Sequence, residues 1–215
     1  MTATQTIKID VVSDTVCPWC FVGKRRMEKA IASYKSKPEH KDVKFEVNWF
    51  PYQLDSTLPK TPINKMDMYM RKFGAARAPL IRDRMVEVGK EDGIAFSYGG
   101  EIVNTMDSHR LIAYATARGK QNEIVDELFT NYFEKERAFT IPTLVEIAVK
   151  VGLDGKEAEE YLKSDQGVQD IKNKIENARR QGVQGVPNIT IGDKYVLSGA
   201  QEPSTIEEVF NRIAA

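Results

Sequence analysis

The sequence predicts an α/β protein in which both ends of the chain build one sheet and a helical insertion lies between them. Strand and helix patterns alternate up to about residue 60, helical patterns fill the middle, and strand patterns return after Gly182. With 215 residues the chain is long for one minimal domain and short for two. We therefore expect a discontinuous domain, residues 1–60 and 166–215, interrupted by an all-helical insertion domain, residues 61–165.

The first unit is a strand, a helix and a second strand. Ile7–Val11 alternates apolar and polar residues, as a half-buried strand does, and Val43–Trp49 repeats this alternation. Between them, apolar residues recur at spacings of three and four, which predicts a helix that buries Met27, Ala30, Ile31 and Tyr34.

The insertion begins with two apolar helical stripes. Asn64 is a candidate N-cap for the first stripe, and the second stripe stops at Gly89 or Gly93. Ile94–Gly100 then predicts an irregular loop. Methionine-rich stripes usually belong to a core, so we expect buried faces formed by Met66, Tyr69, Met70 and Phe73, and by Ile81, Met85 and Val88.

More helices follow, and each has a recognisable start. Asp107 or Ser108 is the predicted cap of one helix, Pro142 opens another, and Asp154 and Asp165 are predicted caps of the last two. Their predicted buried residues include Leu111, Ile112 and Ala115; Ile124, Val125, Leu128, Phe129, Tyr132 and Phe133; Leu144, Ile147 and Ala148; and Val168, Ile171, Ile175 and Ala178.

The chain ends with a hairpin and a short helix. Two β-rich segments, Gly185–Ile191 and Lys194–Ser198, flank a turn at Gly192–Asp193. Ser204, with Glu207 three residues later, forms a predicted capping box for the last helix.

Both cysteines of the chain lie in one motif, Cys17-Pro18-Trp19-Cys20, where the first strand gives way to the first helix. Pro18 suits the first helical position, which would leave Cys17 beside the unpaired N–H groups of the helix N-terminus. That position favours the thiolate of Cys17 over its thiol. Helical geometry brings Cys20 beneath Cys17 at disulfide distance, with Cys17 the more exposed sulfur. The motif therefore predicts a redox site in which Cys17 attacks and Cys20 resolves.

Two other interpretations of the cysteine pair are weaker. A tetrahedral zinc site needs two more ligands, and the only histidines, His40 and His109, show no zinc-binding spacing, so we expect no metal. A pair of buried structural cysteines is the other possibility, and the strand-to-helix context with an intervening proline argues against it.

Charge and composition exclude several classes of partner. Lys+Arg and Asp+Glu both number 31, and no block of five like charges occurs, so we expect neither nucleic acid nor a membrane as a partner. No basic and apolar leader precedes the first strand, and no apolar run approaches membrane-spanning length. We expect a cytoplasmic protein, where a lone cysteine pair is more plausibly catalytic or redox-sensing than a structural disulfide.

The chain resembles DsbA-like thiol–disulfide oxidoreductases, especially the FrnE-like branch, over nearly its whole length. The resemblance rests on motifs spread along the chain, namely Ser13-Asp14 before the cysteine motif, Asn104-Thr105 with His109-Arg110-Leu111, Gly185-Val186-Pro187, and Ser198-Gly199-Ala200-Gln201. It implies a thioredoxin fold interrupted by the helical insertion. It also implies a cis Val186–Pro187 bond, and a substrate that meets Val186 and Pro187 together with Pro18 and Trp19.

Three residues depart from the pattern of these relatives. Val11 stands where many thioredoxin-fold enzymes carry a buried acid, so the sequence leaves open which group accepts the proton of Cys20. Asn188 follows the predicted cis-proline, where FrnE-like proteins often have an aromatic residue. The chain has only two cysteines, so it lacks the second pair of some relatives and needs an external electron donor.

The leading hypothesis is a thiol–disulfide oxidoreductase that acts on protein or small-molecule disulfides. We expect no tightly bound cofactor, with glutathione or a cellular reductase resetting the enzyme. The alternative is a glutathione-dependent transferase or isomerase similar to kappa-class glutathione transferases and hydroxychromene-carboxylate isomerases, which usually carry Ser where Cys17 stands. A third possibility is a non-catalytic, redox-sensitive binding protein.

Asn104 and His109 are the remaining candidates for the site. They belong to a segment rich in uncharged polar groups, which we expect to face Cys17 from the insertion. His109 would then stabilise the thiolate or orient a substrate. A solvated or locally packed histidine is about equally plausible.

Overall fold

The computed structural model describes residues 5–214, so the predicted outer boundaries at residues 1 and 215 lie outside the described residues. A four-stranded sheet of order β2-β1-β5-β6 forms the base of the molecule. Its strands come from both ends of the chain, as predicted. They are β1 (Thr6–Ser13), β2 (Lys44–Pro51), β5 (Asn188–Ile191) and β6 (Tyr195–Ser198).

β1 lies at the centre of this sheet. It pairs in parallel with β2, with Val11 opposite Trp49, and antiparallel with β5, with Val11 opposite Ile189. A parallel pair needs a crossover connection, and the first helix supplies it. Ile7, Ile9 and Val11 are buried, so the alternation in the sequence corresponds to the core face of this strand.

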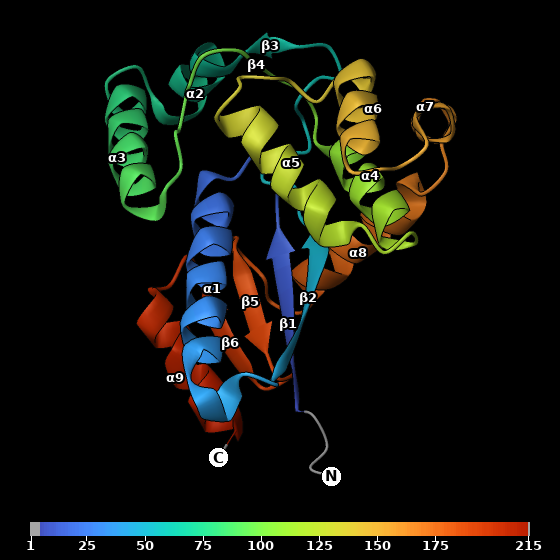
Figure 1. The fold of residues 1–215 in the computed structure, drawn as a ribbon. Coiled ribbons are helices and arrows are strands. Elements are labelled where there is room, and N and C mark those ends of the chain that lie inside the picture. The colour runs from blue at the N-terminus through green and yellow to red at the C-terminus, as the bar shows by residue number, and fades with distance from the viewer. Residues whose placement is uncertain (1–4, 215) are drawn as a thin grey trace.

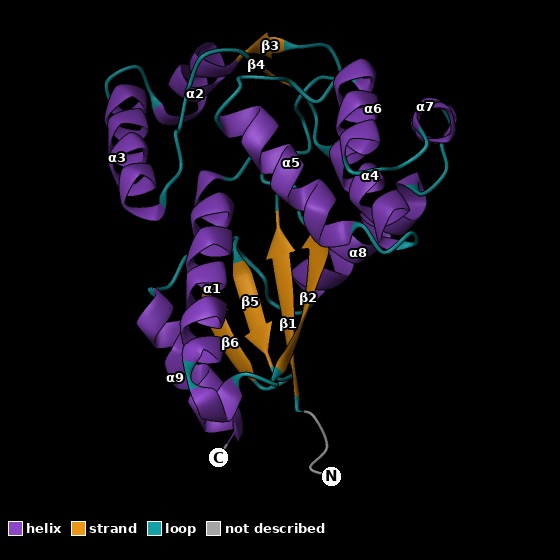
Figure 2. Ribbon diagram, in the orientation of Figure 1, coloured by secondary structure: helices purple, strands orange, loops and turns teal. Residues whose placement is uncertain are grey.

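Helices cover both faces of the sheet (Figures 1 and 2). The crossover helix α1 (Pro18–Ser36), which is followed by a 3₁₀ turn at Pro38–His40, packs against the final helix α9 (Pro203–Ala214). On the other side, α8 (Val168–Arg180) packs against β2. No helix within residues 5–214 combines the length and the apolar character needed to cross a bilayer.

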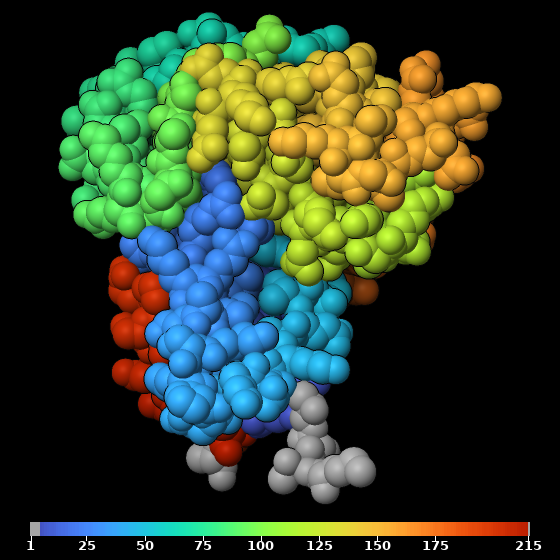
Figure 3. Space-filling model, in the orientation of Figure 1, coloured from blue at the N-terminus to red at the C-terminus, as the bar shows by residue number. Residues whose placement is uncertain are grey.

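The insertion lies over the carboxyl ends of β1 and β2 and the N-terminal end of α1 (Figures 1 and 3). The predicted fold class is confirmed, although a two-stranded pairing of β3 and β4 adds to the helices. The elements of the insertion are β3 (Ile63–Asn64), α2 (Lys65–Phe73), α3 (Arg77–Asp92), β4 (Glu101–Ile102), α4 (Met106–Thr116), α5 (Gln121–Phe133), α6 (Ile141–Lys150) and α7 (Gly155–Lys163).

Side chains of α1 tie the insertion to the sheet layer. Arg26 donates to the buried carboxylate of Asp92 on α3 at 2.8 Å, and Lys24 donates to Asp126 on α5 at 2.7 Å. Phe21 stacks on Phe129 of α5 with ring centroids 5.2 Å apart. Because these contacts involve the helix that carries the cysteines, the insertion and the cysteine motif are held in one arrangement.

Two predicted helix caps are confirmed. The Asn64 side chain accepts from the N–H of Asp67, and the Asp154 side chain accepts from the N–H of Glu157. Each carbonyl or carboxylate satisfies one of the N–H groups that a helix N-terminus leaves unpaired.

The predicted cap of α4 was wrong. Thr105 is the N-cap residue, and Asp107 and Ser108 lie within the first turn. The Ser108 hydroxyl donates to the Thr105 carbonyl and lies 2.8 Å from the hydroxyl of Thr15. Ser108 therefore contacts the strand–helix junction of the first unit instead of capping its own helix.

Two further predicted starts were also misplaced. α8 begins after Gly167, which has a left-handed φ of 77°, and not after Asp165. α9 begins at Pro203, so Ser204 lies inside the first turn and does not cap it. In both cases a residue with special backbone preferences, glycine or proline, decides where the helix starts.

The first predicted stripe of the insertion is only partly buried. Tyr69 is in the core, whereas Met70 and Phe73 are exposed. α2 lies at the outer edge of the insertion (Figure 1), so it buries only the face turned toward the remaining helices. The prediction that Met70 and Phe73 belong to the core was wrong.

Candidate active site

Cys17 occupies the N-cap position of α1, and Pro18 is the first helical residue, as predicted. The N–H of Cys17 donates to the carbonyl of Asp14 at 3.0 Å, which forms the tight turn between β1 and α1. Both cysteines are free thiols and approach each other within 3.3 Å. Cys17 is 4% exposed and Cys20 1% exposed, so Cys17 is the more accessible sulfur but is itself covered.

Cys20 is held as a thiol. Burial raises the pKa of Cys20 well above its ordinary value, and its contact with Cys17 acts in the same direction. Hydrogen bonds from the Ser13 side chain and the Asp14 backbone oppose this rise in pKa without cancelling it. A residue in this environment needs a proton acceptor before it can act as a nucleophile.

The loop before β5 lies against the cysteines. The Val186–Pro187 peptide bond is cis, and the thiol of Cys17 donates to the Val186 carbonyl at 3.5 Å. The carbonyl of Pro187 accepts from the N–H of Gly199 at 2.8 Å, which ties this loop to the start of the segment after β6. The structure thus brings Val186 and Pro187 next to Cys17.

Three buried tyrosines of the insertion lie near the cysteine motif. Burial raises the pKa of Tyr69 on α2, and a thiolate charge on Cys17 adds to the rise. Burial, then Tyr69 and Cys17, raise the pKa of Tyr98 in the loop before β4. Tyr132 on α5 is buried next to Tyr69, Asp14 and Tyr98, which also raise its pKa. All three remain neutral phenols at physiological pH.

Trp19 is the exposed member of the cysteine motif. Its side chain is 40% exposed, while the neighbouring Pro18 is half-buried. An exposed indole beside a reactive sulfur provides apolar area for a binding partner. Contact of Pro18 and Trp19 with substrate stays a prediction.

His109 lies beside the strand–helix junction and is buried. Its Nε2 is 2.8 Å from the carbonyl oxygen of Tyr52 and 3.3 Å from Oδ1 of Asp14. The other carboxylate oxygen of Asp14 accepts from the N–H of Leu54. His109 therefore reaches the residue that holds Cys17 in its turn, and it is not a solvated surface histidine.

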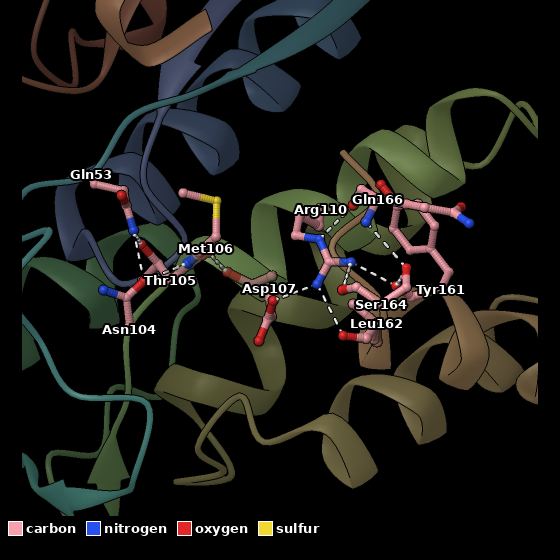
Figure 4. A network of polar contacts seen from close by, with 11 residues as sticks. Gln53, Asn104, Thr105, Met106, Asp107, Arg110, Tyr161, Leu162, Ser164 and Gln166 are labelled. Atoms are coloured by element: carbon pink, nitrogen blue, oxygen red, sulfur yellow. Dashed lines mark hydrogen bonds and ion pairs between the residues drawn. The ribbon is translucent and has the colours of Figure 1, made fainter. Parts of the chain in front are cut away.

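Asn104 contacts the connection that follows β2. Its amide N–H₂ donates to the carbonyls of Ser56 and Leu58 at 3.0 Å, and its side-chain oxygen accepts from Gln53 at 3.0 Å (Figure 4). These contacts organise the long connection after β2. A role of Asn104 in substrate binding stays a prediction.

A model of the DSBA-like thioredoxin domain matches residues 8–211. The chain belongs to this family. The resemblance to DsbA-like oxidoreductases is thereby confirmed, with the general oxidoreductase activity of that family. The FrnE-like branch is compatible with the match and stays a prediction.

Individual relatives of this DsbA-like protein cover nearly the whole chain. The uncharacterized protein YwbO of Bacillus subtilis (strain 168) is 29% identical over 213 residues, which are 96% of this chain and 97% of YwbO. The crystal structure of SCO1869 from Streptomyces coelicolor, a probable DsbA oxidoreductase, has a TM-score of 0.85 at 28% identity, over 96% of this chain and 89% of that chain.

Two more distant structures share the fold. A 2-hydroxychromene-2-carboxylate isomerase has a TM-score of 0.67 at 15% identity, over 96% of both chains. The cytosolic disulfide reductase DsbM from Pseudomonas aeruginosa, solved with GSH, has a TM-score of 0.63 at 13% identity, over 96% of this chain and 98% of DsbM. At these identities the likeness concerns the fold alone.

Sequence reasoning named Ser13-Asp14 as a family motif but gave neither residue a role, and it missed Gly23 in this DsbA-like site. A signal for Gly23 existed, because glycine inside a helix costs about 1 kcal/mol relative to alanine and often marks close packing. A Cβ on Gly23 would lie 3.1 Å from Cγ of Pro187 and 3.7 Å from Cβ of Ala200. The absence of a side chain at Gly23 therefore lets the Pro187 loop approach α1.

We expect Gly23→Val to slow disulfide exchange about tenfold or more, because a displacement of about 1 Å at an active site can reduce rates by that much or more. The branched side chain would push the Pro187 loop away from Cys17. Initial rates on a small disulfide provide the measurement. Ser33→Val, on an exposed part of the same helix, is the matched control and should keep the wild-type rate. Equal rates in the two variants would contradict this role of Gly23.

Within residues 5–214, no group of three or more His, Cys, Asp or Glu side chains is arranged to hold a metal ion.

Proposed function

We propose that this DsbA-like protein is a thiol–disulfide oxidoreductase in which Cys17 is the nucleophile and Cys20 the resolving thiol. The observation that carries the proposal is the asymmetry of the pair. Cys17 lies at the N-terminus of α1 next to the Val186 carbonyl, whereas burial keeps Cys20 protonated behind it. A helix N-terminus stabilises a thiolate, whereas a buried thiol stays protonated and reacts only in the later, resolving step.

The reaction has two exchanges. The Cys17 thiolate attacks a substrate disulfide, forms a mixed disulfide and releases one substrate thiol. Cys20 then attacks Cys17, forms the Cys17–Cys20 disulfide and releases the second substrate thiol. The half-buried Val186 and the exposed Trp19 offer a carbonyl and an apolar surface to the substrate.

Glutathione is the proposed reductant that returns the pair to dithiol, with a cellular reductase as the other source of electrons. The two cysteines are the only ones in the chain, so electrons must come from outside. DsbM, which shares the fold, was solved with GSH and is a cytosolic disulfide reductase. Together with the charge balance and the lone cysteine pair, this supports a cytoplasmic enzyme that reduces protein or small-molecule disulfides.

A glutathione-coupled assay tests this function. Wild-type protein, glutathione, glutathione reductase and NADPH would be mixed with either 2-hydroxyethyl disulfide or insulin. We expect NADPH oxidation well above the rate of a Cys17→Ser/Cys20→Ser double variant. A wild-type rate equal to that of the double variant on both substrates would reject the proposal and leave a redox-sensitive binding protein. If the double variant still catalyses a glutathione-dependent isomerisation, that result would favour the isomerase alternative.

A further inference from the structure

A cavity of about 320 Å³ lies between the ends of β1 and β2 and helices α4, α5 and α8. Ser13, Thr15 and His109, which are all buried, line it together with Phe50 and Lys174, which are exposed. The cavity therefore runs from solvent to the strand–helix junction. Much of its wall is apolar, but Ser13, Thr15 and His109 give its inner end the polar groups that water molecules need.

Ser13 connects this cavity to Cys20. Ser13 is one of the residues that line the cavity, and its side chain also interacts with the buried Cys20, where it opposes the rise in the pKa of that thiol. A hydroxyl can donate one hydrogen bond while it accepts another, so it can relay a proton. Ser13 could therefore transfer a proton from Cys20 to the cavity.

Among the residues that the structure describes, two titratable side chains line this cavity, His109 and Lys174. A lysine is already protonated at neutral pH, and it cannot accept a proton. Histidine is the side chain that changes charge near pH 7. His109 is therefore the one group on the cavity wall with the chemistry to take the proton.

The contacts of His109 determine which of its nitrogens is available. A carbonyl oxygen only accepts hydrogen bonds, so Nε2, at 2.8 Å from the Tyr52 oxygen, carries the hydrogen and donates. In the neutral ring Nδ1 is then the acceptor, and none of the hydrogen bonds found for His109 uses it. Asp14, 3.3 Å from Nε2, would stabilise the imidazolium that forms when Nδ1 gains a proton.

We propose that His109 accepts the proton of Cys20 through Ser13 and water in this cavity. The inference rests on the proposed oxidoreductase function. Cys20 gives its proton to Ser13, Ser13 passes its own proton to water, and water protonates Nδ1 of His109. The Cys20 thiolate then forms a bond with the sulfur of Cys17, and the bond between Cys17 and the substrate breaks. Its electron pair leaves on the substrate sulfur, so the substrate is reduced and the cysteine pair oxidised.

The charged groups around His109 come from several elements. Asp14 approaches from the β1–α1 junction, and Lys174 faces the cavity from α8. On α4 itself, Asp107 and Arg110 pair with each other at 2.7 Å. Among these groups, Asp14 lies 3.3 Å from Nε2 of His109, whereas Lys174 is exposed and its charge is screened by solvent.

A two-phase experiment separates this inference from the function on which it rests. The reduced protein is mixed with an aromatic disulfide that releases a coloured thiolate. The first release reports attack by Cys17, and the second reports attack by Cys20. Cys20→Ser, which should show the first release alone, assigns the two phases. The rates are recorded by stopped flow between about pH 5 and 9, a range that spans the ordinary histidine pKa.

His109→Gln is the decisive variant, because a glutamine amide can still donate to Tyr52 but cannot accept a proton in place of Nδ1. We expect its second release to be about tenfold to a hundredfold slower at pH 7, and to rise steadily with hydroxide concentration. The first release should stay within about twofold of wild type. Added imidazole should accelerate the second release in His109→Ala. Thr116→Val, on the same helix and cavity wall, is the matched control and should leave both rates unchanged.

Each outcome decides between the hypotheses. A second release in His109→Gln with the wild-type rate and pH profile overturns the role of His109 and leaves the oxidoreductase function intact. No first release from the wild-type protein overturns the function and the inference together. If His109→Gln does not fold, Ser13→Ala interrupts the same path from the Cys20 side. Ser13→Ala should slow the second release and leave the first unchanged. Unchanged rates of both releases in this variant would reject the proton path through Ser13.

Discussion

Cys17→Ser is expected to lower the disulfide-exchange rate by about a thousandfold or more. In the Cys20→Ser protein, Cys17 should still attack the substrate and remain bound to it as a mixed disulfide. A serine hydroxyl does not ionise at neutral pH and is not a nucleophile toward sulfur without an activating base. Without Cys20, the mixed disulfide on Cys17 has no internal thiol to resolve it.

Intact-mass measurement after incubation with glutathione disulfide checks this prediction. Cys20→Ser should carry one glutathione adduct, and Cys17→Ser should carry none, because the remaining sulfur is 1% exposed and held as a thiol. Both changes are nearly isosteric, so equal thermal midpoints provide the folding control. An adduct on Cys20 in the Cys17→Ser protein, with none in the converse variant, would reverse the assignment.

Arg110→Ala is expected to lower the free energy of unfolding by about 3 to 5 kcal/mol, the range for removing one partner of a buried charged network. Arg110 is 2% exposed, and its guanidinium closes the connection between α7 and α8 (Figure 4). It donates at 2.6 to 3.0 Å to the carbonyls of Tyr161, Leu162, Ser164 and Gln166, and at 2.7 Å to the carboxylate of Asp107.

Urea unfolding of the variants measures this loss. Removal of the guanidinium leaves buried carbonyls without donors, and lysine cannot replace the planar fork, so Arg110→Lys should also be clearly destabilised. Asp107→Asn is the matched control, since it keeps an acceptor for Arg110 and should lose less than about 1 kcal/mol. A loss of under about 1 kcal/mol in Arg110→Ala would show that other groups hold this connection.

Much of the cysteine motif was predictable because its determinants are local. The alternation in Ile7–Val11 and the proline after Cys17 place the first sulfur at a helix N-terminus, as observed. Cys20 follows one helical turn later, which fixes its distance from Cys17. The position of Val186–Pro187 near the site came from the family resemblance, because no local pattern connects residues so far apart in the chain.

Surroundings of the site were much less predictable. His109 and Asp14 are separated by 95 positions, and their contact exists only because α4 crosses the strand–helix junction. Gly23 and Pro187 meet because the last strands return beside α1. The helix starts at Thr105 and Gly167 also differed from the predicted caps, because hydroxyl and carboxylate side chains that suit a cap can serve a tertiary contact instead.

The sequence by itself determined the strand, helix and turn periods and the redox pair, since each depends on residues within one or two turns of one another. Only the tertiary structure decided that Met70 and Phe73 are exposed, that buried tyrosines of the insertion lie near Cys17, and that a cavity reaches Ser13. Burial and proton access are properties of the space between elements distant in the chain. That space depends on packing between the insertion and the sheet, which no local pattern encodes.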